Sequence, residues 1–334
     1  MGVTLREVAA RAKVSIGTVS AVINGSALVK EKTRNQVLKV VRDLNYRPNR
    51  LARSLRTKKT LSIGLIISDI TNPFFPEIVR GAEDVAKKEG YNIILCNTDE
   101  DVTTGVSSLN LLREKRVDGL ILVGGVVPTE EIKELQEEGF PTVIVEREFD
   151  GLKLNTVLVD SKAGAYEATL HLINLGHRRI GFISGPLNRP PSLGRFEGYK
   201  LALKESGIGW DDSLVKEGDF RFNGGHRAMI QLLHRPQLPS AVFASNDLMA
   251  IGALEAIKSQ GLSIPEDIAV VGYDDIPEAS YTSPSLTTVA LPKRRLGATA
   301  MELLLKILAG EEKTSQRIVL PTKLVIRKSC GANI

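Results

Sequence analysis

Two hydropathy patterns divide the chain into a short N-terminal part and a long remainder. Near the N-terminus apolar positions recur with helical spacing, as in "LREVAARA", where Leu5, Val8, Ala9 and Ala12 share one face. From Leu61 onward, short runs of Val, Ile and Leu alternate with amphipathic stretches. Apolar strands that alternate with helices are typical of parallel sheets covered on both faces. The pattern therefore predicts a small all-α domain followed by an α/β core.

The N-terminal part predicts three short helices. Thr4 followed by Glu7 is a capping box for the first helix, and Ser15 is a good N-cap for the second. A third helix is expected over about 30–45, where one apolar stripe is formed by Val37, Val40, Val41 and Leu44. Because a tight turn separates the first two helices, residues 1–47 are predicted to form a helix-turn-helix domain.

A basic segment, "RPNRLARSLRTKK", follows and is interpreted as a hinge over residues 48–59. Pro48 is well placed to start a short helix, because its missing N–H would be unpaired at a helix N-terminus anyway. A helix of this length is marginal in water and needs a surface on which to form. The alternative is a charged linker between domains.

The remaining residues, 60–334, predict an α/β core of two doubly wound lobes. The expected strands are "LSIGLII", "YNIILCN", "DGLILVG", "TVIVE", "TVLVD", "RIGFISG", "AVFAS", "IAVVGYD" and "TTVAL". The helices between them are closed by glycines that can adopt the left-handed C′ conformation, at Gly90, Gly139, Gly176, Gly207 and Gly261. So many strands exceed what one such sheet holds at this length, and the cleft between two lobes is the default ligand site.

Charge is distributed unevenly along the chain. Residues 1–60 hold 14 Lys and Arg against 3 acidic residues, whereas the rest holds 30 basic and 36 acidic residues. One end of the molecule is therefore expected to meet a polyanion. No apolar run reaches the roughly 20 residues that span a bilayer, and the N-terminus does not resemble a secretory signal. The two cysteines, Cys96 and Cys330, are too few for a disulfide framework, which fits a cytoplasmic protein.

Several motifs in a fixed order carry a family resemblance across essentially the whole chain. They are "TLREVAARAKVSIGTVSAVING", "YRPNRLARSLRT", "SIGLIISDITNPFF", "GHRRIGFISGP", "GRFEGYKLAL", "SNDLMAIGAL" and "VGYDD". Together they resemble the lactose/galactose-repressor family of bacterial transcription regulators, and most of all its ribose and purine repressors. The resemblance implies a helix-turn-helix headpiece, a hinge helix, and a two-lobed core like that of periplasmic sugar-binding proteins.

The resemblance also implies how the core divides and assembles. The chain crosses between the lobes three times, so the N-terminal lobe takes in about 60–159 and 290–320. The C-terminal lobe takes in about 160–289 and 321–334. No heptad-rich tetramerisation tail follows, so a homodimer on a palindromic double-stranded operator is expected.

In related repressors the base-contacting side chains lie at the start of the second helix and one turn later. Those positions carry Ile16, Gly17 and Ala21 here, so the bidentate Arg or Asn contacts that discriminate bases most strongly are missing. Methyl contacts to thymine and a close backbone approach remain. The residues expected to position the duplex, largely through its phosphates, are Thr4, Ser15, Thr18, Ser20, Asn24, Thr33 and Arg34.

The hinge is expected to supply part of the readout that the second helix lacks. In the family, one hinge helix from each subunit enters the minor groove, and a leucine wedges between base pairs. Leu55 matches that leucine, and Arg53 lies beside it. Insertion of such a wedge costs the free energy of unstacking two base pairs, and the bent DNA contacts more of the protein in return. Specificity would therefore depend on how easily the central base-pair step of the operator deforms.

The motif "ITNPFF" marks the effector cleft, because it follows the first core strand, whose carboxyl end faces the cleft. Asn72 can hydrogen-bond hydroxyls, and Phe74 and Phe75 can stack on a flat ligand, although one of the two rings can instead pack within the lobe. Matching positions in sugar- and purine-binding relatives add Glu146, Arg147, Arg189, Arg195, Phe220, Asn246 and Asp274.

Among these positions Arg195 and Asp274 are expected to be central, since an Asp facing an Arg offers paired charge-assisted hydrogen bonds to vicinal hydroxyls. Asp160 and Asp247 are interpreted as helix N-caps. The motifs "TNPFF", "FNGG" and "SND" favour a pentose, ribose first. "GPLNR" and "GDF" favour a purine, which would make the protein a corepressor-dependent repressor.

Two other functional classes are weighed against a ligand-responsive repressor. A stand-alone sugar-binding protein would not need the basic residues 1–59. An enzyme is opposed by glycine clusters without phosphate-loop spacing and by four histidines without metal-ligand spacing. The sequence therefore predicts a DNA-binding regulator with a small-molecule effector and neither a cofactor nor a metal.

Overall fold

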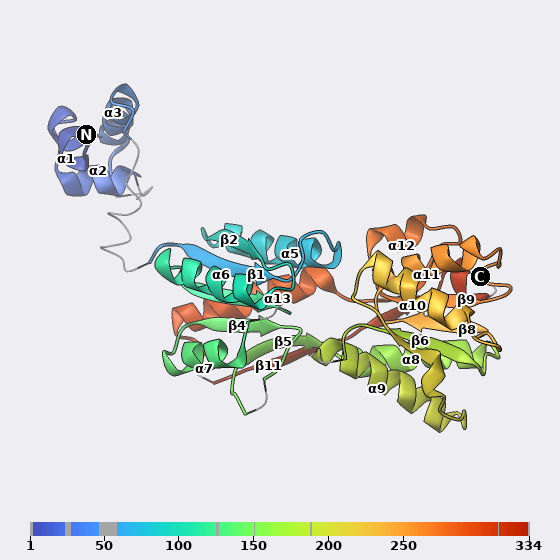
Figure 1. Ribbon diagram of the computed structural model, residues 1–334. Helices are drawn as coiled ribbons and strands as arrows, with labels where there is room; N and C mark the ends of the chain where they lie inside the picture. Colours follow the sequence, from blue (N-terminus) through green and yellow to red (C-terminus); the bar gives the residue numbers. More distant parts are fainter. Residues whose placement is uncertain are drawn as a thin grey trace. The chain divides into compact units, whose positions relative to one another are not determined.

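The computed structural model describes residues 3–23, 28–46, 59–124, 127–149, 151–187, 189–312 and 314–332. The chain forms two compact units, Met1–Thr60 and Leu61–Ile334, which are coloured along the sequence in Figure 1. The first unit is the headpiece and the second is the core. In the part of the chain so described, no helix has both the length and the apolarity that crossing a bilayer requires.

The headpiece consists of three helices, α1 (Leu5–Arg11), α2 (Ile16–Ile23) and α3 (Glu31–Asp43). The capping box predicted for α1 is present, since Thr4 Oγ1 accepts from Glu7 N and the Glu7 carboxylate accepts from Thr4 N. The helices share a small apolar core that comprises Val8, Ala9, Ala12, Val19, Val22 and Val37. Gln36 Nε2 donates to Ala12 O at 2.9 Å and so fixes α3 against the turn that follows α1.

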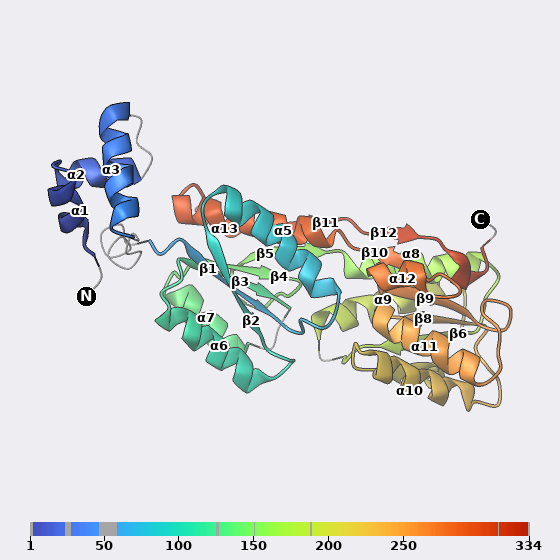
Figure 2. The same ribbon diagram turned by 90° about the horizontal axis from the view of Figure 1, so that it is seen from above.

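The N-terminal lobe is built on a parallel sheet with strand order β11-β5-β4-β3-β1-β2. Its strands are β1 (Ser62–Ile67), β2 (Asn92–Asn97), β3 (Gly119–Val123), β4 (Thr142–Val145), β5 (Asn155–Val159) and β11 (Arg317–Leu320). Figure 2 shows that helices cover both faces of this sheet. One face carries α5 (Phe74–Lys88) and α13 (Lys293–Ala309), and the other carries α6 (Val102–Glu114) and α7 (Thr129–Glu137).

The C-terminal lobe repeats this plan with strand order β12-β10-β9-β8-β6-β7, in which only β12 runs antiparallel to its neighbour. Its strands are β6 (Ile180–Ser184), β7 (Val215–Glu217), β8 (Ala241–Ala244), β9 (Ala269–Asp274), β10 (Thr287–Ala290) and β12 (Lys323–Val325). Its helices are α8 (Ser161–Asn174), α9 (Pro190–Glu205), α10 (Phe222–Leu233), α11 (Asp247–Ser259) and α12 (Pro277–Tyr281). In Figure 1, α8 and α9 lie on one side of the sheet, and α10 and α11 on the other.

The chain passes between the two lobes three times. β5 leads into α8, β10 leads into α13, and β11 leads into β12. Because each passage joins elements of different sheets, the carboxyl ends of strands from both lobes face one shared cleft.

Close helix packing stiffens the N-terminal lobe. A Cβ placed on Gly81 of α5 would lie 2.0 Å from Arg294 O, and one on Gly297 of α13 would lie 1.9 Å from Ile78 O. Larger residues at either position would force the two helices apart. α5 and α13 therefore act as one rigid pair.

The C-terminal lobe contains an aromatic stack that reaches its surface. Phe182 stacks on Tyr199 with 4.8 Å between ring centroids, and Phe196 lies 5.7 Å from Phe182. Trp210, 40% exposed, meets the edges of Phe196 and Tyr199 at 5.7 and 6.1 Å. The stack therefore extends from β6 through α9 to the outer face of the lobe.

Candidate functional site: recognition helix and interlobe cleft

The N-terminal turn of α2 is the exposed part of the candidate recognition helix. Ser15 Oγ accepts from Thr18 N at 3.0 Å and lies 2.9 Å from Thr18 Oγ1, as an N-cap does. Ile16 is 43% exposed, whereas Val19 is fully buried. A Cβ on Gly17 would meet only Ser15 Oγ, at 3.6 Å, so the helix surface is open there.

The other predicted DNA contacts lie further along α2 and at the starts of α1 and α3. Thr4 is the N-cap of α1, Ser20 and Ala21 are half-buried on α2, and Thr33 and Arg34 occupy the first turn of α3. Asn24, Arg53 and Leu55 fall outside the described residues, so their DNA contacts remain predictions.

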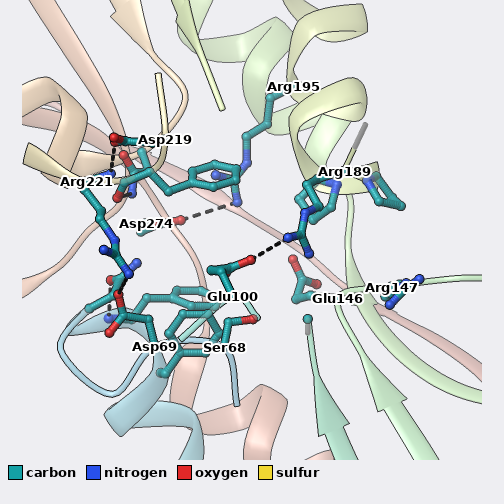
Figure 3. A pocket seen from close by; sticks show the side chains of 18 of the residues that line it. Ser68, Asp69, Glu100, Glu146, Arg147, Arg189, Arg195, Asp219, Arg221 and Asp274 are labelled. Carbon is teal, nitrogen blue, oxygen red and sulfur yellow. Dashed lines mark hydrogen bonds and ion pairs between the residues drawn. The ribbon is translucent and has the colours of Figure 1, made fainter. Parts of the chain in front are cut away.

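The second candidate site is a cleft of about 340 Å³ between the two lobes of the core. Figure 3 shows its charged side chains, which converge from loops that follow the strands. Asp69 follows β1, Glu146 follows β4, and Asp274 ends β9. The predicted residues Asn72, Phe74, Phe75, Arg147, Arg189, Arg195, Phe220, Asn246 and Asp274 all line this cleft.

Arg195 and Asp274 form the buried polar centre of the cleft. Their side chains are 5% and 6% exposed, with 3.4 Å between Arg195 Nη2 and Asp274 Oδ1. The guanidinium also donates to Ser245 O and lies 4.0 Å above the ring of Tyr273. Among the described residues, Arg195 Nε and Asp274 Oδ1 are buried and have no hydrogen-bond partner, although Asp274 Oδ1 is the atom that forms the ion pair with Arg195 Nη2.

Burial dominates the acid–base behaviour of the cleft. It raises the pKa of Asp274 to about 6, although the positive charges of Arg195 and Lys293 oppose the rise. Burial also raises the pKa of Glu146 to about 7, although the charge of Arg195 and the hydrogen bond from Val159 N both lower it. Glu146 Oε1 accepts that N–H at 2.7 Å, so this carboxyl group holds the end of β5, where the chain first leaves the N-terminal lobe.

Two ion pairs join the lobes at the cleft. Arg189 Nη2 lies 2.7 Å from Glu100 Oε2, and Arg221 Nη2 lies 3.1 Å from Asp69 Oδ2. In Figure 3 the Arg189–Glu100 pair spans the cleft beside Arg195. Glu100, Asp69 and Arg221 were not among the predicted site residues. Their position just after strands β1, β2 and β7 is the signal that could have identified them.

Aromatic rings line the cleft from both lobes. Phe74 is buried and Phe75 is half-buried, and their rings meet edge to face at 5.2 Å, so one packs in the lobe while the other lines the cleft more openly. Asn72 Oδ1 accepts from Phe74 N at 3.0 Å and fixes this turn. Phe220 has a φ of +62°, and a Cβ on Gly185 would lie 2.2 Å from its ring.

Asn246, which lines the cleft as predicted, also caps α11 in place of Asp247. Asn246 is the N-cap, because its Oδ1 accepts from Met249 N while its Nδ2 donates to Phe220 O. Asp247 was interpreted as the N-cap, and that interpretation is wrong. Its fully buried carboxyl group accepts instead from Ile276 N and from Thr288 Oγ1.

Two further predicted residues are held by their surroundings. Asp160 caps α8 by accepting from Ala163 N at 2.9 Å. Arg147 lines the cleft, but its Nη1 donates to Val127 O and its guanidinium lies 4.1 Å above Phe149. Among the residues that the structure describes, no group of three or more His, Cys, Asp or Glu could hold a metal ion.

A helix-turn-helix headpiece joined to a two-lobed core with a polar interlobe cleft defines the class of ligand-responsive, DNA-binding regulators. Residues 4–49 match the model described as "Bacterial regulatory proteins, lacI family". Residues 169–330 match "Periplasmic binding protein-like domain". The chain belongs to the lacI family of bacterial regulatory proteins and is a ligand-responsive transcriptional repressor.

Full-length relatives agree with this assignment. The chain is 42% identical over 329 residues to the ribose operon repressor of Escherichia coli K12, covering 98% of this chain and 99% of that protein. It is 38% identical over 330 residues to catabolite control protein A of Priestia megaterium, with coverage of 98% and 99%. Histophilus somni PurR, an HTH-type transcriptional repressor, is 38% identical over 329 residues, with 98% of each chain covered.

Solved structures agree as well. A Lac repressor dimer bound to operator and the anti-inducer ONPF has a TM-score of 0.89 and 31% identity, covering 99% of this chain and 100% of that one. A LacI family regulator from Enterococcus faecium with bound ribose has a TM-score of 0.72 and 36% identity, with coverage of 80% and 98%.

Proposed function

We propose that the protein is a homodimeric repressor of a palindromic operator, and that a pentose, ribose first, switches its operator affinity from the interlobe cleft. The observation that carries the effector proposal is the buried pair of Arg195 and Asp274, 3.4 Å apart. A cation and a carboxylate side by side, each with a buried atom that has no hydrogen-bond partner among the described residues, suit two neighbouring hydroxyl groups. Phe75 and Phe220 offer apolar faces to the ring of a sugar.

The charges of the cleft support an uncharged effector. Three arginines of its lining are already paired with carboxylates of the same cleft, in Arg189–Glu100, Arg195–Asp274 and Arg221–Asp69. A phosphate group would have to compete with these carboxylates for its cations. A neutral polyol fits the same groups without displacing any of them.

The relatives support the same proposal. The Escherichia coli relative is named a ribose operon repressor, and the Enterococcus faecium structure holds ribose. The Lac repressor structure is a dimer on its operator, which supports a dimer here. The protein acts in the cytoplasm, where its DNA lies, and needs neither a cofactor nor a catalytic step.

On the DNA side, phosphate contacts supply most of the affinity and the headpiece reads few bases directly. Ile16 and Thr18 provide methyl groups for thymine, and Gly17 allows close approach of the backbone. The family resemblance adds Leu55 as a wedge in the minor groove. Leu55→Ala is expected to lower operator affinity and DNA bending while effector binding is unchanged.

Calorimetry on the full-length protein tests the effector, with ribose, other pentoses, hypoxanthine and guanine. Ribose is expected to give saturable heat, and Asp274→Asn is expected to abolish it. A gel shift with and without ribose then gives the direction of the switch. Heat from a purine alone would support the purine corepressor instead, and no heat from any pentose would reject the proposed effector class.

A further inference from the structure

Lys293 is a buried cation at the first residue of α13, and its side chain belongs to neither lobe's apolar core. Only 9% of the residue is exposed. A positive charge at a helix N-terminus is opposed by the helix dipole, and burial of an ammonium group costs further free energy. Strong hydrogen-bond acceptors must therefore offset the free-energy cost of placing the ammonium group of Lys293 here.

Those partners are two consecutive backbone carbonyls beside the effector cleft. Lys293 Nζ donates to Asp274 O and, at 2.7 Å, to Asp275 O. Both aspartates have positive φ, +112° and +52°, a conformation that residues with side chains adopt at a cost. The lysine therefore holds a strained turn whose first residue carries the carboxyl group at the centre of the cleft.

The other end of this connection lies in the N-terminal lobe. α13 is packed against α5 without a gap at Gly81 and Gly297, and Arg294 is paired with Asp84 of α5 at 3.1 Å. α5 begins at Phe74, on the opposite wall of the cleft. Lys293 thus joins the turn after β9 in one lobe to the rigid helix pair of the other.

We propose that Lys293 is a positioning residue for effector recognition, which holds the turn at Asp274 so that its ionised carboxyl group meets the effector. This inference rests on the proposed function, because it takes Asp274 as an effector ligand.

The charge of Lys293 also bears on whether Asp274 is ionised. Asp274 faces Arg195 on α9 and Lys293 on α13, whose positive charges lower its pKa. It also faces two carboxyl groups, Glu146 after β4 and Asp247 on α11, whose own pKa values the charge of Asp274 raises. Without the lysine charge, only the positive charge of Arg195 would lower the pKa of Asp274 against the effect of burial. The pKa of Asp274 should then rise above about 6.

Ribose titrations of Lys293→Met at several pH values test the role. At about pH 7 the variant is expected to bind ribose roughly tenfold more weakly than the wild type. The loss should shrink as the pH is raised, because Asp274 ionises again, but it should not vanish, because the two carbonyl contacts stay lost. Lys306→Met is the matched control, because Lys306 is an exposed lysine of the same helix. Unchanged ribose affinity, or a loss in Lys306→Met as large as that in Lys293→Met, would overturn the proposal.

A second measurement needs no effector. In protein with 13C-labelled aspartate carboxyl groups, the Asp274 resonance is assigned by its absence from Asp274→Asn, and its titration midpoint is compared between wild type and variants. Lys293→Gln, which keeps a donor for one carbonyl but carries no charge, should raise the midpoint as Lys293→Met does. An unchanged midpoint in both variants would overturn the role of the lysine. If the wild type binds no pentose while the midpoint rises, the proposed effector fails and the electrostatic role stands.

Discussion

Arg221 and Asp69 come from opposite lobes, and 3.1 Å separates Arg221 Nη2 from Asp69 Oδ2 across the cleft. The carboxylate is 9% exposed and also accepts from the backbone and hydroxyl group of Thr71. The guanidinium is 56% exposed. The side chain of Asp69 is therefore fixed within the N-terminal lobe, whereas the exposed side chain of Arg221 extends across the cleft from the C-terminal lobe.

The two interlobe ion pairs should favour a closed cleft. We predict that Arg221→Met together with Arg189→Met lowers ribose affinity roughly two- to thirtyfold, because exposed pairs of this kind contribute about 0.2 to 1 kcal/mol each. Calorimetry in low and high salt checks this, since salt should weaken binding by the wild type but not by the double variant. Arg227→Met, which removes an exposed pair within the C-terminal lobe, is the control. Equal salt dependence in all three proteins would contradict the prediction.

Gly185 makes room for the ring of Phe220, because a Cβ there would lie 2.2 Å from the ring atom Cζ. Gly185→Ala is expected to push the ring into the cleft and to lower ribose affinity by roughly tenfold or more, at a stability cost of about 1 to 3 kcal/mol. Gly209→Ala serves as the control, since a Cβ on Gly209 meets nothing within 4 Å. Unchanged ribose affinity in Gly185→Ala would show that the ring moves away from the cleft instead.

Glu146 should make the unfolding free energy depend on pH. Its pKa is about 7 in the folded protein against 4.5 for an ordinary glutamate, so the native state binds the proton more tightly than the unfolded chain does. The stability that this proton contributes is fully present below pH 4.5 and is lost as the pH rises through about 7. Glu146→Gln should lack this loss, and by chemical denaturation it should exceed the wild type by about 1 to 3 kcal/mol above neutral pH. A pH-independent difference would contradict this prediction.

Ile16 tests direct readout by the recognition helix. Because its side chain is 43% exposed at the start of α2, Ile16→Ala is expected to relax discrimination at one T·A pair in each half-site. Binding to a set of operators substituted at single positions measures this. Leu38→Ala, a comparable exposed change on α3, should leave the preference intact. A uniform loss over all operators would assign Ile16 to packing.

Most of the fold follows from local patterns in the sequence. The nine predicted strands are present, and the glycines at Gly90, Gly139, Gly176, Gly207 and Gly261 all have φ between 65° and 97°. β7, β11 and β12 were missed, because each is a short, partly exposed strand at the edge of a sheet.

The site could be predicted only in part. Arg195 and Asp274 were identified because each lies in a recognisable motif. The interlobe pairs were not, since Arg221 and Asp69 are 152 residues apart, and a position just after a strand does not show which carboxylate an arginine meets. Asn246 and Asp247 could each cap α11, and only the distant partner Thr288 decides between them. Ion pairs and hydrogen bonds between residues that are distant in the sequence cannot be predicted from the hydropathy pattern.

The aromatic stack of the C-terminal lobe has a practical consequence, because Trp210 is the single tryptophan of the chain. Its emission reports on one lobe, and it touches Phe196, the residue that follows Arg195 on α9. Unfolding followed by fluorescence would therefore record the melting of the C-terminal lobe alone, while far-ultraviolet circular dichroism records both. Any separation between the two transition curves would show that the C-terminal lobe and the rest of the chain lose their structure in sequence.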